Sequence, residues 1–191
     1  MEDSVKQAQK AVVSETIKTR RTINLFQNKA VSVQQIISAI DHARWAPNHR
    51  LTEPWHFYLL GEKTREKIIQ LIVEIKSTGR SENIRLSTRK RLDAIPGWFV
   101  LTHDISSDPI VQEENYAATC CAAQNLMLSL WSEGIGVKWT TGDVTRDDRF
   151  YELLKINKNK RRVVGLFWYG YPAKVPVQRR RATKDIISKL D

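Results

Sequence analysis

Apolar residues recur at three- and four-residue steps over much of the chain, which predicts a helix-rich protein. The strongest period covers residues 113–133 and is carried by Tyr116, Cys120, Ala123, Met127, Leu130 and Trp131. Several small residues in this segment would let neighbouring elements approach closely, so we expect a central buried helix that ends at Gly134. Further helices are expected over residues 4–18, from the capping residue Ser32 to before Pro47, over 63–77 and over 147–154.

Four short runs of aromatic and branched residues predict strands over residues 55–60, 98–102, 137–140 and 163–169. Helices separate these strands at irregular intervals rather than as a regular strand–helix–strand succession, so the pattern predicts an α+β fold. The basic stretch 83–94 is expected to be a helix or a loop. A length of 191 residues fits one domain, which we place over residues 1–191.

The composition agrees with a folded globular protein, and the net charge adds a prediction about binding partners. Hydrophobic residues make up 41% and charged residues 27% of the chain, which excludes a disordered protein. The net charge of +10 predicts anionic partners without identifying them. Basic residues gather toward the C-terminal end, in one cluster over 158–162 and a second that holds Arg179, Arg180, Arg181 and Lys184. Such clusters are typical of a solvated surface, and nucleic-acid binding is the less favoured alternative.

Targeting and metal-binding signals are missing from the sequence. No apolar run is long enough for a membrane helix and no secretory signal opens the chain, so we expect a cytoplasmic protein that binds no membrane. Cys120 and Cys121 are adjacent, so they cannot readily pair with each other, and we expect reduced thiols that pack within a helix. The four histidines are scattered and have no zinc-ligand spacing, which predicts no metal site.

The sequence lacks the nucleotide-binding and hydrolase motifs that would suggest a chemistry by themselves. Arg20, Arg21 and Thr22 stand where the first predicted helix ends. Two guanidinium groups and a hydroxyl group at a turn suit a phosphate, because arginine matches phosphate oxygens in a bidentate way.

Four segments together resemble the FMN-dependent nitroreductase family. These are residues 19–26, with Arg20, Arg21, Thr22 and Phe26; residues 46–57, which read APNHRLTEPWHF; residues 134–142, which read GIGVKWTTG; and the ending from Gly165 through Gly170, Tyr171 and Pro172 to Arg179 and Arg181. Their order and spacing match across residues 19–184, nearly the whole chain.

The resemblance implies an α+β fold of the nitroreductase type, with a central, mostly antiparallel sheet flanked by helices and an intertwined homodimer that holds FMN at the subunit interface. Arg20, Arg21 and Thr22 would hold the phosphate and the ribityl chain, and Arg179 and Arg181 would close on the phosphate. His49 and Glu53 would approach the flavin, one of them from the partner subunit, while Trp139, Thr140 and Thr141 would line the site from the other side.

Two residues and one longer stretch depart from the family pattern. Glu53 stands where the family usually has glutamine, and because an ionised carboxylate only accepts hydrogen bonds, we expect Glu53 to lower the flavin potential unless Arg50 neutralises it. Thr140 replaces an arginine found in some small relatives. The basic stretch 77–93 has no counterpart, and it is either a mobile lid that sets the acceptor or a surface excursion.

The function that this resemblance implies is an FMN-dependent oxidoreductase. It would pass electrons from NAD(P)H to a small acceptor, such as a nitroaromatic or a quinone, by a ping-pong mechanism. No catalytic side chain is expected, because the flavin carries the hydride chemistry and the protein supplies binding, orientation and charge. The alternatives are a non-catalytic flavin-binding module and, less favoured, a basic nucleic-acid-binding domain.

Overall fold

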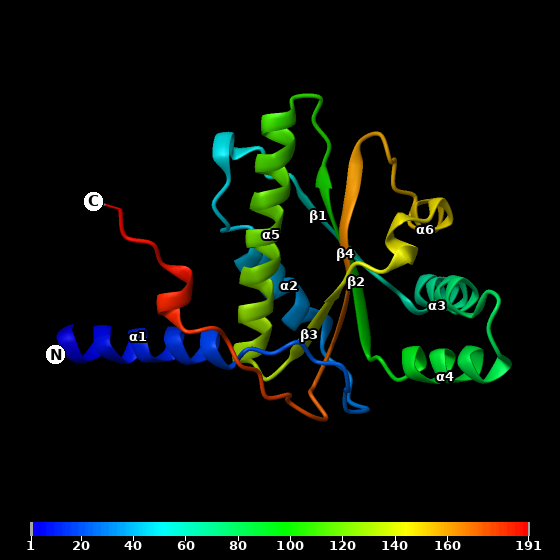
Figure 1. Cartoon of the computed structure of the whole chain (residues 1–191), viewed down its shortest axis with the longest axis horizontal. Helices are drawn as coiled ribbons and strands as arrows, with labels where there is room; N and C mark the ends of the chain where they lie inside the picture. The colour runs from blue at the N-terminus through cyan, green and yellow to red at the C-terminus, as the bar shows by residue number, and fades with distance from the viewer. Residues whose placement is uncertain (1, 191) are drawn as a thin grey trace.

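The computed structural model describes the backbone of residues 2–190 and the side chains of residues 3–190 (Figure 1). Its helices are α1 (Glu2–Thr19), α2 (Val33–Ala43), α3 (Glu62–Ser77), α4 (Glu82–Asp93), α5 (Pro109–Ser132) and α6 (Asp148–Leu153). Its strands are β1 (Trp55–Leu59), β2 (Gly97–Asp104), β3 (Gly136–Thr140) and β4 (Arg161–Gly170). Short 3-10 turns lie at η1 (His49–Leu51), η2 (Asp143–Arg146) and η3 (Thr183–Ile186).

The four strands form one sheet in the order β1-β2-β4-β3, and every pair of neighbours is antiparallel. Strand β3 pairs only with the second half of β4, where Gly136 lies opposite Gly170 and Thr140 opposite Leu166. The first half of β4 therefore extends beyond the end of β3. A short parallel bridge joins Thr22 to Val137 at the outer edge of β3.

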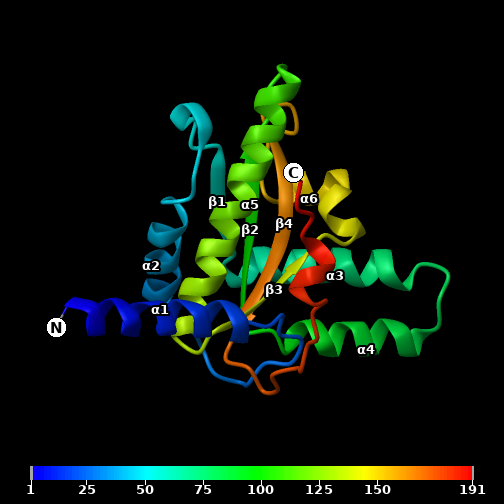
Figure 2. The ribbon, with the colours of Figure 1, turned by 60° about the vertical axis from the view of Figure 1, so that its left-hand side comes forward.

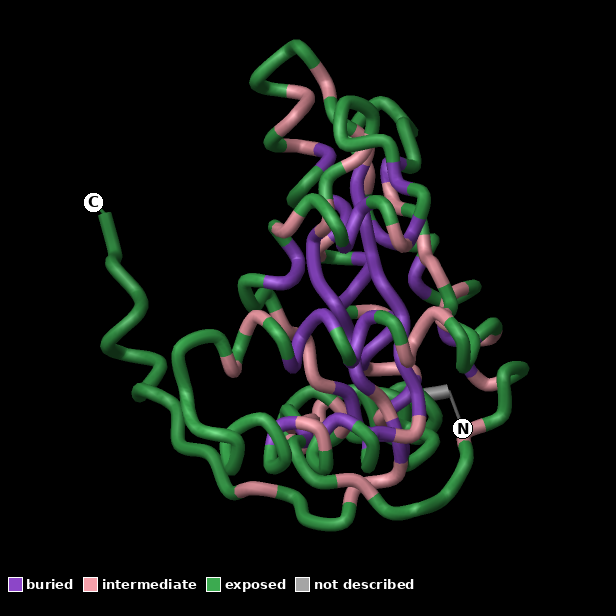
Figure 3. The backbone as a smooth tube through the Cα atoms, turned by 90° about the vertical axis from the view of Figure 1, so that its right-hand side faces the viewer, coloured by how far each residue is buried: buried purple, intermediate pink, exposed green. Residues whose placement is uncertain are grey.

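Helices cover both faces of this sheet (Figures 1 and 2). On one face, α2 and α5 pack against Phe99, Leu101 and Phe167. On the other, α3, α4 and α6 pack against side chains that include Val100 and Leu166. Because neighbouring residues of a strand point to opposite faces, the uninterrupted apolar runs of β2 and β4 fill both cores. The buried backbone is concentrated along these strands and the helix faces that touch them (Figure 3).

The caps explain where two helices begin. Ser32 forms the expected cap of α2, with its hydroxyl accepting from Gln35 N while the Gln35 side chain accepts from Ser32 N. Helix α5 begins at Pro109, four residues before the predicted start, because Asp108 accepts from the backbone N–H groups of Ile110 and Val111.

The expected α+β arrangement is confirmed, and the structure refines three of its elements. The basic stretch 83–94, for which the sequence allows a helix or a loop, is the helix α4, and the ion pair of Arg89 with Glu66 joins it to α3. Helix α5 is buried on one face only, since Tyr116 on the other face is 48% exposed. Both cysteines are free as expected, but Cys121 is exposed and does not pack within the chain.

The two ends of the chain stand apart from the body of the molecule. Helix α1 touches α5 near its C-terminal end, where Trp131 Nε1 donates to Thr19 Oγ1 at 2.9 Å, and the rest of α1 projects outward (Figure 1). Its apolar stripe is exposed, with Val12 at 65%. Residues 173–190 likewise run along the outside (Figures 1 and 3). No helix within the described range has both the length and the apolar character that a membrane span requires.

Candidate functional site

Three arginines gather where α1 ends, and we call them the arginine cluster: Arg20, Arg21 and Arg180. Arg20 directly follows the helix, and Arg21 Nη1 donates to the carbonyl oxygens of Lys18 at 2.6 Å and of Arg20 at 2.9 Å. Burial lowers the pKa of Arg20, and the charges of Arg180 and then Arg21 lower it further. None of the three forms a salt bridge with another described residue. The cluster thus concentrates positive charge that an anion would neutralise.

The C-terminal segment that supplies Arg180 has no regular structure and passes close to the end of α1 (Figures 1 and 2). The sequence prediction placed Arg179 and Arg181 here, on one side of an extended segment. In the structure Arg179, Arg180 and Arg181 are all exposed, and Arg180 is the one whose charge acts on Arg20. The roles of Arg179 and Arg181 stay predictions, and Arg180 joins them as a candidate that the sequence analysis did not name.

The chain leads from the arginine cluster directly to the edge of the sheet. Thr22 bridges Val137, and Ile23 N donates to Val137 O at 3.2 Å. The next polar side chain, Asn24, accepts a hydrogen bond from Lys138 Nζ at 2.7 Å. The predicted residues Arg20, Arg21 and Thr22 therefore lie at one end of β3, and Trp139, Thr140 and Thr141 lie at its other end.

A second group of positive charges surrounds β3 on the side of α3, and we call it the Lys138 cluster: Lys76, Arg91 and Lys138. Burial lowers the pKa of Lys138, followed by the charges of Arg91 and Lys76. Burial likewise lowers the pKa of Lys76, where Arg91 adds to the effect and Asp143 opposes it. Lys138 and Thr140 are two residues apart on a strand, so they share this face of the sheet. Lys76 and Lys138 thus lie on the side of Thr140 that faces α3, and the charge of Arg91 acts on both of them.

The space next to Thr140 is a small cavity of about 40 Å³. Lys76, Gly142 and Asp143 line it from two elements, and Trp168 forms part of its wall. The indole N–H of Trp168 is the one buried side-chain polar group of the described residues without a hydrogen-bond partner. Such groups are rare in folded proteins, so this wall differs from an ordinary packed core.

Trp139 points to the opposite face of the sheet and belongs to the core there. Its indole Nε1 donates to Val164 O at 3.1 Å, and its ring stacks on Phe167 with 5.2 Å between the ring centroids. Gly165 leaves the space that this ring fills, since a Cβ atom there would lie 2.2 Å from Trp139 Nε1. Trp139 therefore anchors the end of β3 through packing.

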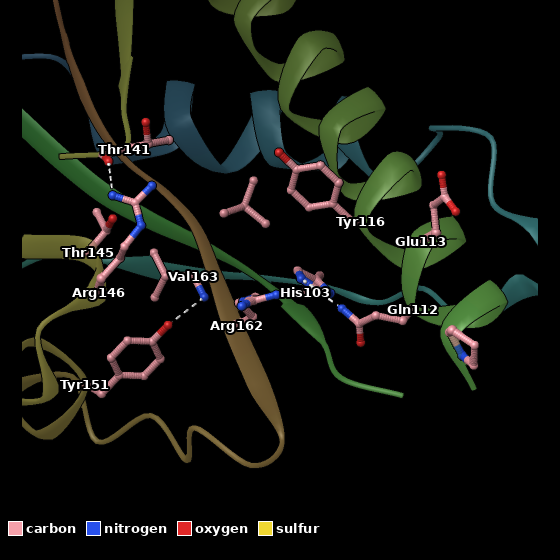
Figure 4. Close-up of a pocket in the computed structure, with 12 residues that line it drawn as sticks. His103, Gln112, Glu113, Tyr116, Thr141, Thr145, Arg146, Tyr151, Arg162 and Val163 are labelled. Atoms are coloured by element: carbon pink, nitrogen blue, oxygen red, sulfur yellow. Dashed lines mark hydrogen bonds between the residues drawn. The ribbon is translucent and has the colours of Figure 1, made fainter. Parts of the chain in front are cut away.

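Thr141 lines a much larger cavity of about 540 Å³ that lies beyond the end of β3 (Figure 4). Arg146 from η2 donates through Nη1 to Thr141 O at 3.2 Å, and Arg162 enters the wall from β4. Helix α5 contributes Tyr116 and Gln112 on the opposite side of the cavity (Figure 4). A cavity with two arginines in its wall thus adjoins the predicted segment 139–141.

His103 forms part of the same wall and is 1% exposed. Its Nδ1 lies 3.0 Å from Asp104 O, so Nδ1 carries the proton and Nε2 accepts from Gln112 Nε2 at 3.5 Å. Burial lowers the pKa of His103, the bond to Asp104 O opposes this shift, and the charge of Arg162 adds to it. The sequence did not indicate that His103 lines a cavity, because the cavity wall around it is formed by Tyr116 from α5 and Arg162 from β4.

His49 and Glu53 lie at the other edge of the molecule, around η1 and before β1. Strands β1 and β3 are the two edge strands of the sheet, separated by β2 and β4. One chain therefore does not bring His49 and Glu53 to Thr140 or to the arginine cluster. Both residues are exposed and free to face a second molecule.

The loop that carries His49 and Glu53 is strained. Arg50, Leu51 and Glu53 have φ values of 62°, 49° and 45°, in the left-handed region that other residues than glycine seldom occupy. Asn48 holds the loop by accepting from Glu53 N through Oδ1 at 2.6 Å and donating to Thr52 Oγ1 at 3.1 Å. Such strain costs on the order of 1–3 kcal/mol per residue and clusters at functional sites.

The fold and these surfaces define an α+β protein with positive charge along one edge strand, and comparison with known proteins identifies its class. The model of the Nitroreductase family matches residues 17–171, so the chain belongs to this family. The matched range contains Arg20, Arg21, the strained loop and β3, and it ends before the C-terminal arginines.

Individual relatives agree with the family. The Bacillus subtilis (strain 168) protein named "Putative NAD(P)H nitroreductase YfhC" is 27% identical over 187 residues, which are 95% of this chain and 96% of that protein. The crystal structure of a nitroreductase-like family protein from Bacillus cereus is 29% identical, has a TM-score of 0.80 and covers 94% of this chain and 96% of its own. A nitroreductase-type protein from Desulfovibrio desulfuricans, solved in complex with FMN, shares the fold with a TM-score of 0.74 at 16% identity, over 94% of this chain and 96% of its own.

Proposed function

We propose that this protein is an FMN-dependent oxidoreductase that passes electrons from NAD(P)H to a small acceptor, such as a nitroaromatic or a quinone. Membership of the Nitroreductase family supports this proposal, as do the name of the Bacillus subtilis relative and the FMN bound to the Desulfovibrio desulfuricans protein. The observation that carries it is the arginine cluster, which offers unneutralised guanidinium groups beside Thr22 at the end of a helix.

The arginine cluster fits a phosphate monoester. Guanidinium groups donate in pairs to phosphate oxygens, and a dianion would remove the mutual repulsion that lowers the pKa of Arg20. Thr22 adds a hydroxyl donor, and Arg179 and Arg181 on either side of Arg180 add further positive charge. In this assignment Arg20, Arg21 and Arg180 hold the phosphate, and Thr22 contacts the phosphate or the ribityl chain.

The other end of β3 fits a ring system that becomes more negative during turnover. FMN, when bound, supplies the two-electron chemistry, so the protein needs no nucleophile or base of its own. Thr140 and Thr141 would contact the ring, while the Lys138 cluster would favour its reduced, anionic form. Trp139 would fix the position of this segment through its bond to Val164 O rather than by contact with the ring.

The site is completed by a second subunit in this proposal. His49 and Glu53 lie on a strained, exposed loop at the far edge of the sheet, so they reach the cofactor of a partner rather than that of their own chain. The exposed apolar stripe of α1 supports an intertwined homodimer. Donor and acceptor would then visit one exposed flavin face in turn, which is a ping-pong mechanism. A single domain over residues 1–191 and a cytoplasmic location remain predictions.

Purification and an anaerobic titration test the proposal. The purified protein is expected to be yellow, and NADH or NADPH is expected to bleach it until an acceptor restores the colour. A yellow protein that neither coenzyme bleaches would be a non-catalytic flavin-binding module. Colourless protein that does not take up FMN would contradict the proposal, and retention on nucleic acid would then support the basic-domain alternative.

The phosphate assignment has its own test. The double substitution Arg20→Ala and Arg180→Ala is expected to weaken FMN binding at least about tenfold, since a charge-assisted hydrogen bond contributes about 1.5–3 kcal/mol. Arg85→Ala serves as the control, because Arg85 lies on the exposed surface of α4 and pairs with Glu82. Unchanged FMN affinity in the double variant would refute the assignment of the arginine cluster to the phosphate.

A further inference from the structure

We propose that the cavity beside Thr141 binds a small aromatic anion, and that Arg146 and Arg162 hold its carboxylate group. The same ligand would be the electron acceptor, and this part of the inference rests on the proposed function. The anion site itself rests only on the cavity and on its charges.

The cavity belongs to a longer groove. A second cavity, of about 530 Å³, adjoins the cavity of about 540 Å³, and the two share Gln112, Arg146, Tyr151 and Arg162 in their walls. Arg146 comes from η2 and Arg162 from β4, so two separate elements bring their guanidinium groups to the junction of the cavities. Arg146, Arg162 and Tyr116 surround one open space in the wider cavity (Figure 4).

The charges of the groove leave two cations free for a ligand. Of its four basic residues, Lys158 pairs with Asp148 and Arg161 pairs with Asp104 at 2.9 Å. Arg146 and Arg162 form no ion pair within residues 3–190, and the one carboxylate among the described residues of the walls is Glu113. A groove with surplus positive charge and two unpaired guanidinium groups favours a carboxylate, which arginine binds in a bidentate way.

The remaining walls suit an aromatic ring. Tyr116 packs edge-on against His103 with 5.7 Å between the ring centroids, and a hydrogen bond with Cys120 is the main cause that raises the pKa of its phenol. Tyr116 therefore stays protonated at neutral pH and offers a hydroxyl donor. His103 keeps its proton on Nδ1 for Asp104 O, so it presents a neutral ring to the groove. A planar ligand can lie against these rings while its acid group faces the arginines.

Arg146 also connects the groove to the segment that the proposed function places at the flavin. Its bond to Thr141 O at 3.2 Å fixes the guanidinium group next to this segment. An acceptor held there would take two electrons at its nitro or quinone group while its carboxylate stays unchanged. For a nitroaromatic acid the net step is ArNO₂ + NAD(P)H + H⁺ → ArNO + NAD(P)⁺ + H₂O, in which the coenzyme is oxidised and the nitro group is reduced.

The test compares 4-nitrobenzoate with 4-nitrobenzamide, which has a similar size and no charge. Isothermal titration of the oxidised holoenzyme is expected to show saturable binding of the acid, and kcat/KM is expected to be about tenfold higher for the acid. Arg146→Gln and Arg162→Gln are each expected to lower the affinity for the acid about threefold to tenfold, and to lower the ratio of kcat/KM for the acid to kcat/KM for the amide by a similar factor. The ratio corrects for any general loss of activity through the bond of Arg146 to Thr141 O. Arg146→Lys and Arg162→Lys should restore part of the preference.

Arg85→Gln is the matched control, because Arg85 lies on α4 and pairs with Glu82 away from the groove. If the enzyme keeps its FMN and shows equal affinity and equal kcat/KM for the acid and the amide, the inference is overturned and the proposed function still stands. A rise in KM for NADPH with unchanged use of the acid would also overturn it, since the arginines would then hold a nucleotide phosphate. If the protein binds no FMN, titration with 4-nitrobenzoate still tests the anion site alone.

Discussion

Among single residues, Lys138 allows the most direct test of the proposed electron transfer, through the effect of its charge on the potential of the flavin. Its ammonium group lies 2.7 Å from Asn24 Oδ1, beside Thr140 and within the Lys138 cluster. If FMN lies along β3, removing this charge disfavours the reduced, anionic cofactor. We expect Lys138→Met to lower the midpoint potential of the bound flavin by a few tens of millivolts, since 30 mV corresponds to about 1.4 kcal/mol for two electrons. Lys138→Arg keeps the charge and is the control, and an equal potential in both variants would exclude this role.

His103 carries a second prediction, on the pH dependence of stability. Burial holds the pKa of His103 below its ordinary value, with Arg162 adding to the shift and the carbonyl group of Asp104 opposing it. The unfolded chain therefore takes up a proton more readily than the folded one once the pH falls below about 6.5. The stability that neutral His103 provides is present above this pH and is lost progressively as the pH falls toward the folded pKa.

His103→Asn removes the titrating group and keeps an N–H donor for Asp104 O. Chemical unfolding between pH 7 and pH 5 should therefore show a smaller loss of the free energy of unfolding in this variant than in the wild type. His42→Asn makes the same exchange at an exposed position of α2 and is the comparison. If the free energy of unfolding falls equally with pH in the wild type and in His103→Asn, His103 does not contribute to the pH dependence of stability.

The sequence indicates where a single residue lies when it stands directly beside a regular element, and indicates this less well where the chain is irregular. Arg20, Arg21 and Thr22 follow a helix end directly, so their position depends on a few local dihedral angles. Arg180 lies in a segment without regular structure, where no periodicity indicates which side chain comes near Arg20. His103 needed the neighbouring strand and α5 to define its surroundings, and those contacts join residues far apart in the sequence.

At the level of elements, close packing between β3 and β4 fixes the position of the segment 139–141, which belongs to the candidate site. Gly165 lies under the ring of Trp139, and a Cβ atom there would approach Trp139 Nε1 to 2.2 Å and Phe167 Cε2 to 3.1 Å. The ring cannot move away without losing its bond to Val164 O. Gly165→Ala should therefore destabilise the protein by about 1–3 kcal/mol, as overpacked cores do, and should displace the segment 139–141.

Thermal unfolding and tryptophan fluorescence measure the two effects of Gly165→Ala. Gly61→Ala is the control, since a Cβ atom at Gly61 meets nothing within 4 Å. We expect a clear fall in the unfolding temperature and weaker FMN binding for the first variant, and little change for the second. Wild-type fluorescence and stability in Gly165→Ala would contradict the close packing between this glycine and Trp139.

The elements themselves followed from the sequence because local patterns specify them. Apolar periodicity located α3, whose residues Ile68, Ile69 and Ile72 are buried. The order of the strands did not follow from any local pattern, since the pairing of β2 with β4 joins segments about sixty residues apart. The basic stretch of α4 was ambiguous for a related reason: its ion pair from Arg89 to Glu66 depends on a second helix.

In the molecule as a whole, several apolar side chains are exposed on the surface of the single chain. The stripe on α1 includes Val5, Val12, Val13 and Ile17, and all four are exposed. Trp45 and Leu51 are exposed as well, on the loop that precedes β1. Apolar surface gathered on one helix and one loop is typical of a protein–protein contact, which supports the proposed homodimer. The sequence suggested this arrangement only through the family resemblance, because helical periodicity shows that a face is apolar and does not show what covers it.

This arrangement leads to a prediction that connects assembly with cofactor binding. Val12→Asp places a charge in the middle of the stripe on α1, and a buried, unpaired carboxylate strongly opposes association. If α1 packs against a second subunit, Val12→Asp should shift the protein from dimer to monomer in light scattering. FMN affinity should fall with it, because Arg20 directly follows α1 and the proposed contacts of His49 and Glu53 come from the partner.

Gln7→Asp is the control for Val12→Asp: it adds the same charge to the opposite side of α1 and should leave the oligomeric state and the FMN affinity unchanged. A Val12→Asp variant that remains dimeric with full FMN affinity would exclude α1 from the interface, whereas a monomer that still binds FMN fully would show that one chain completes the site.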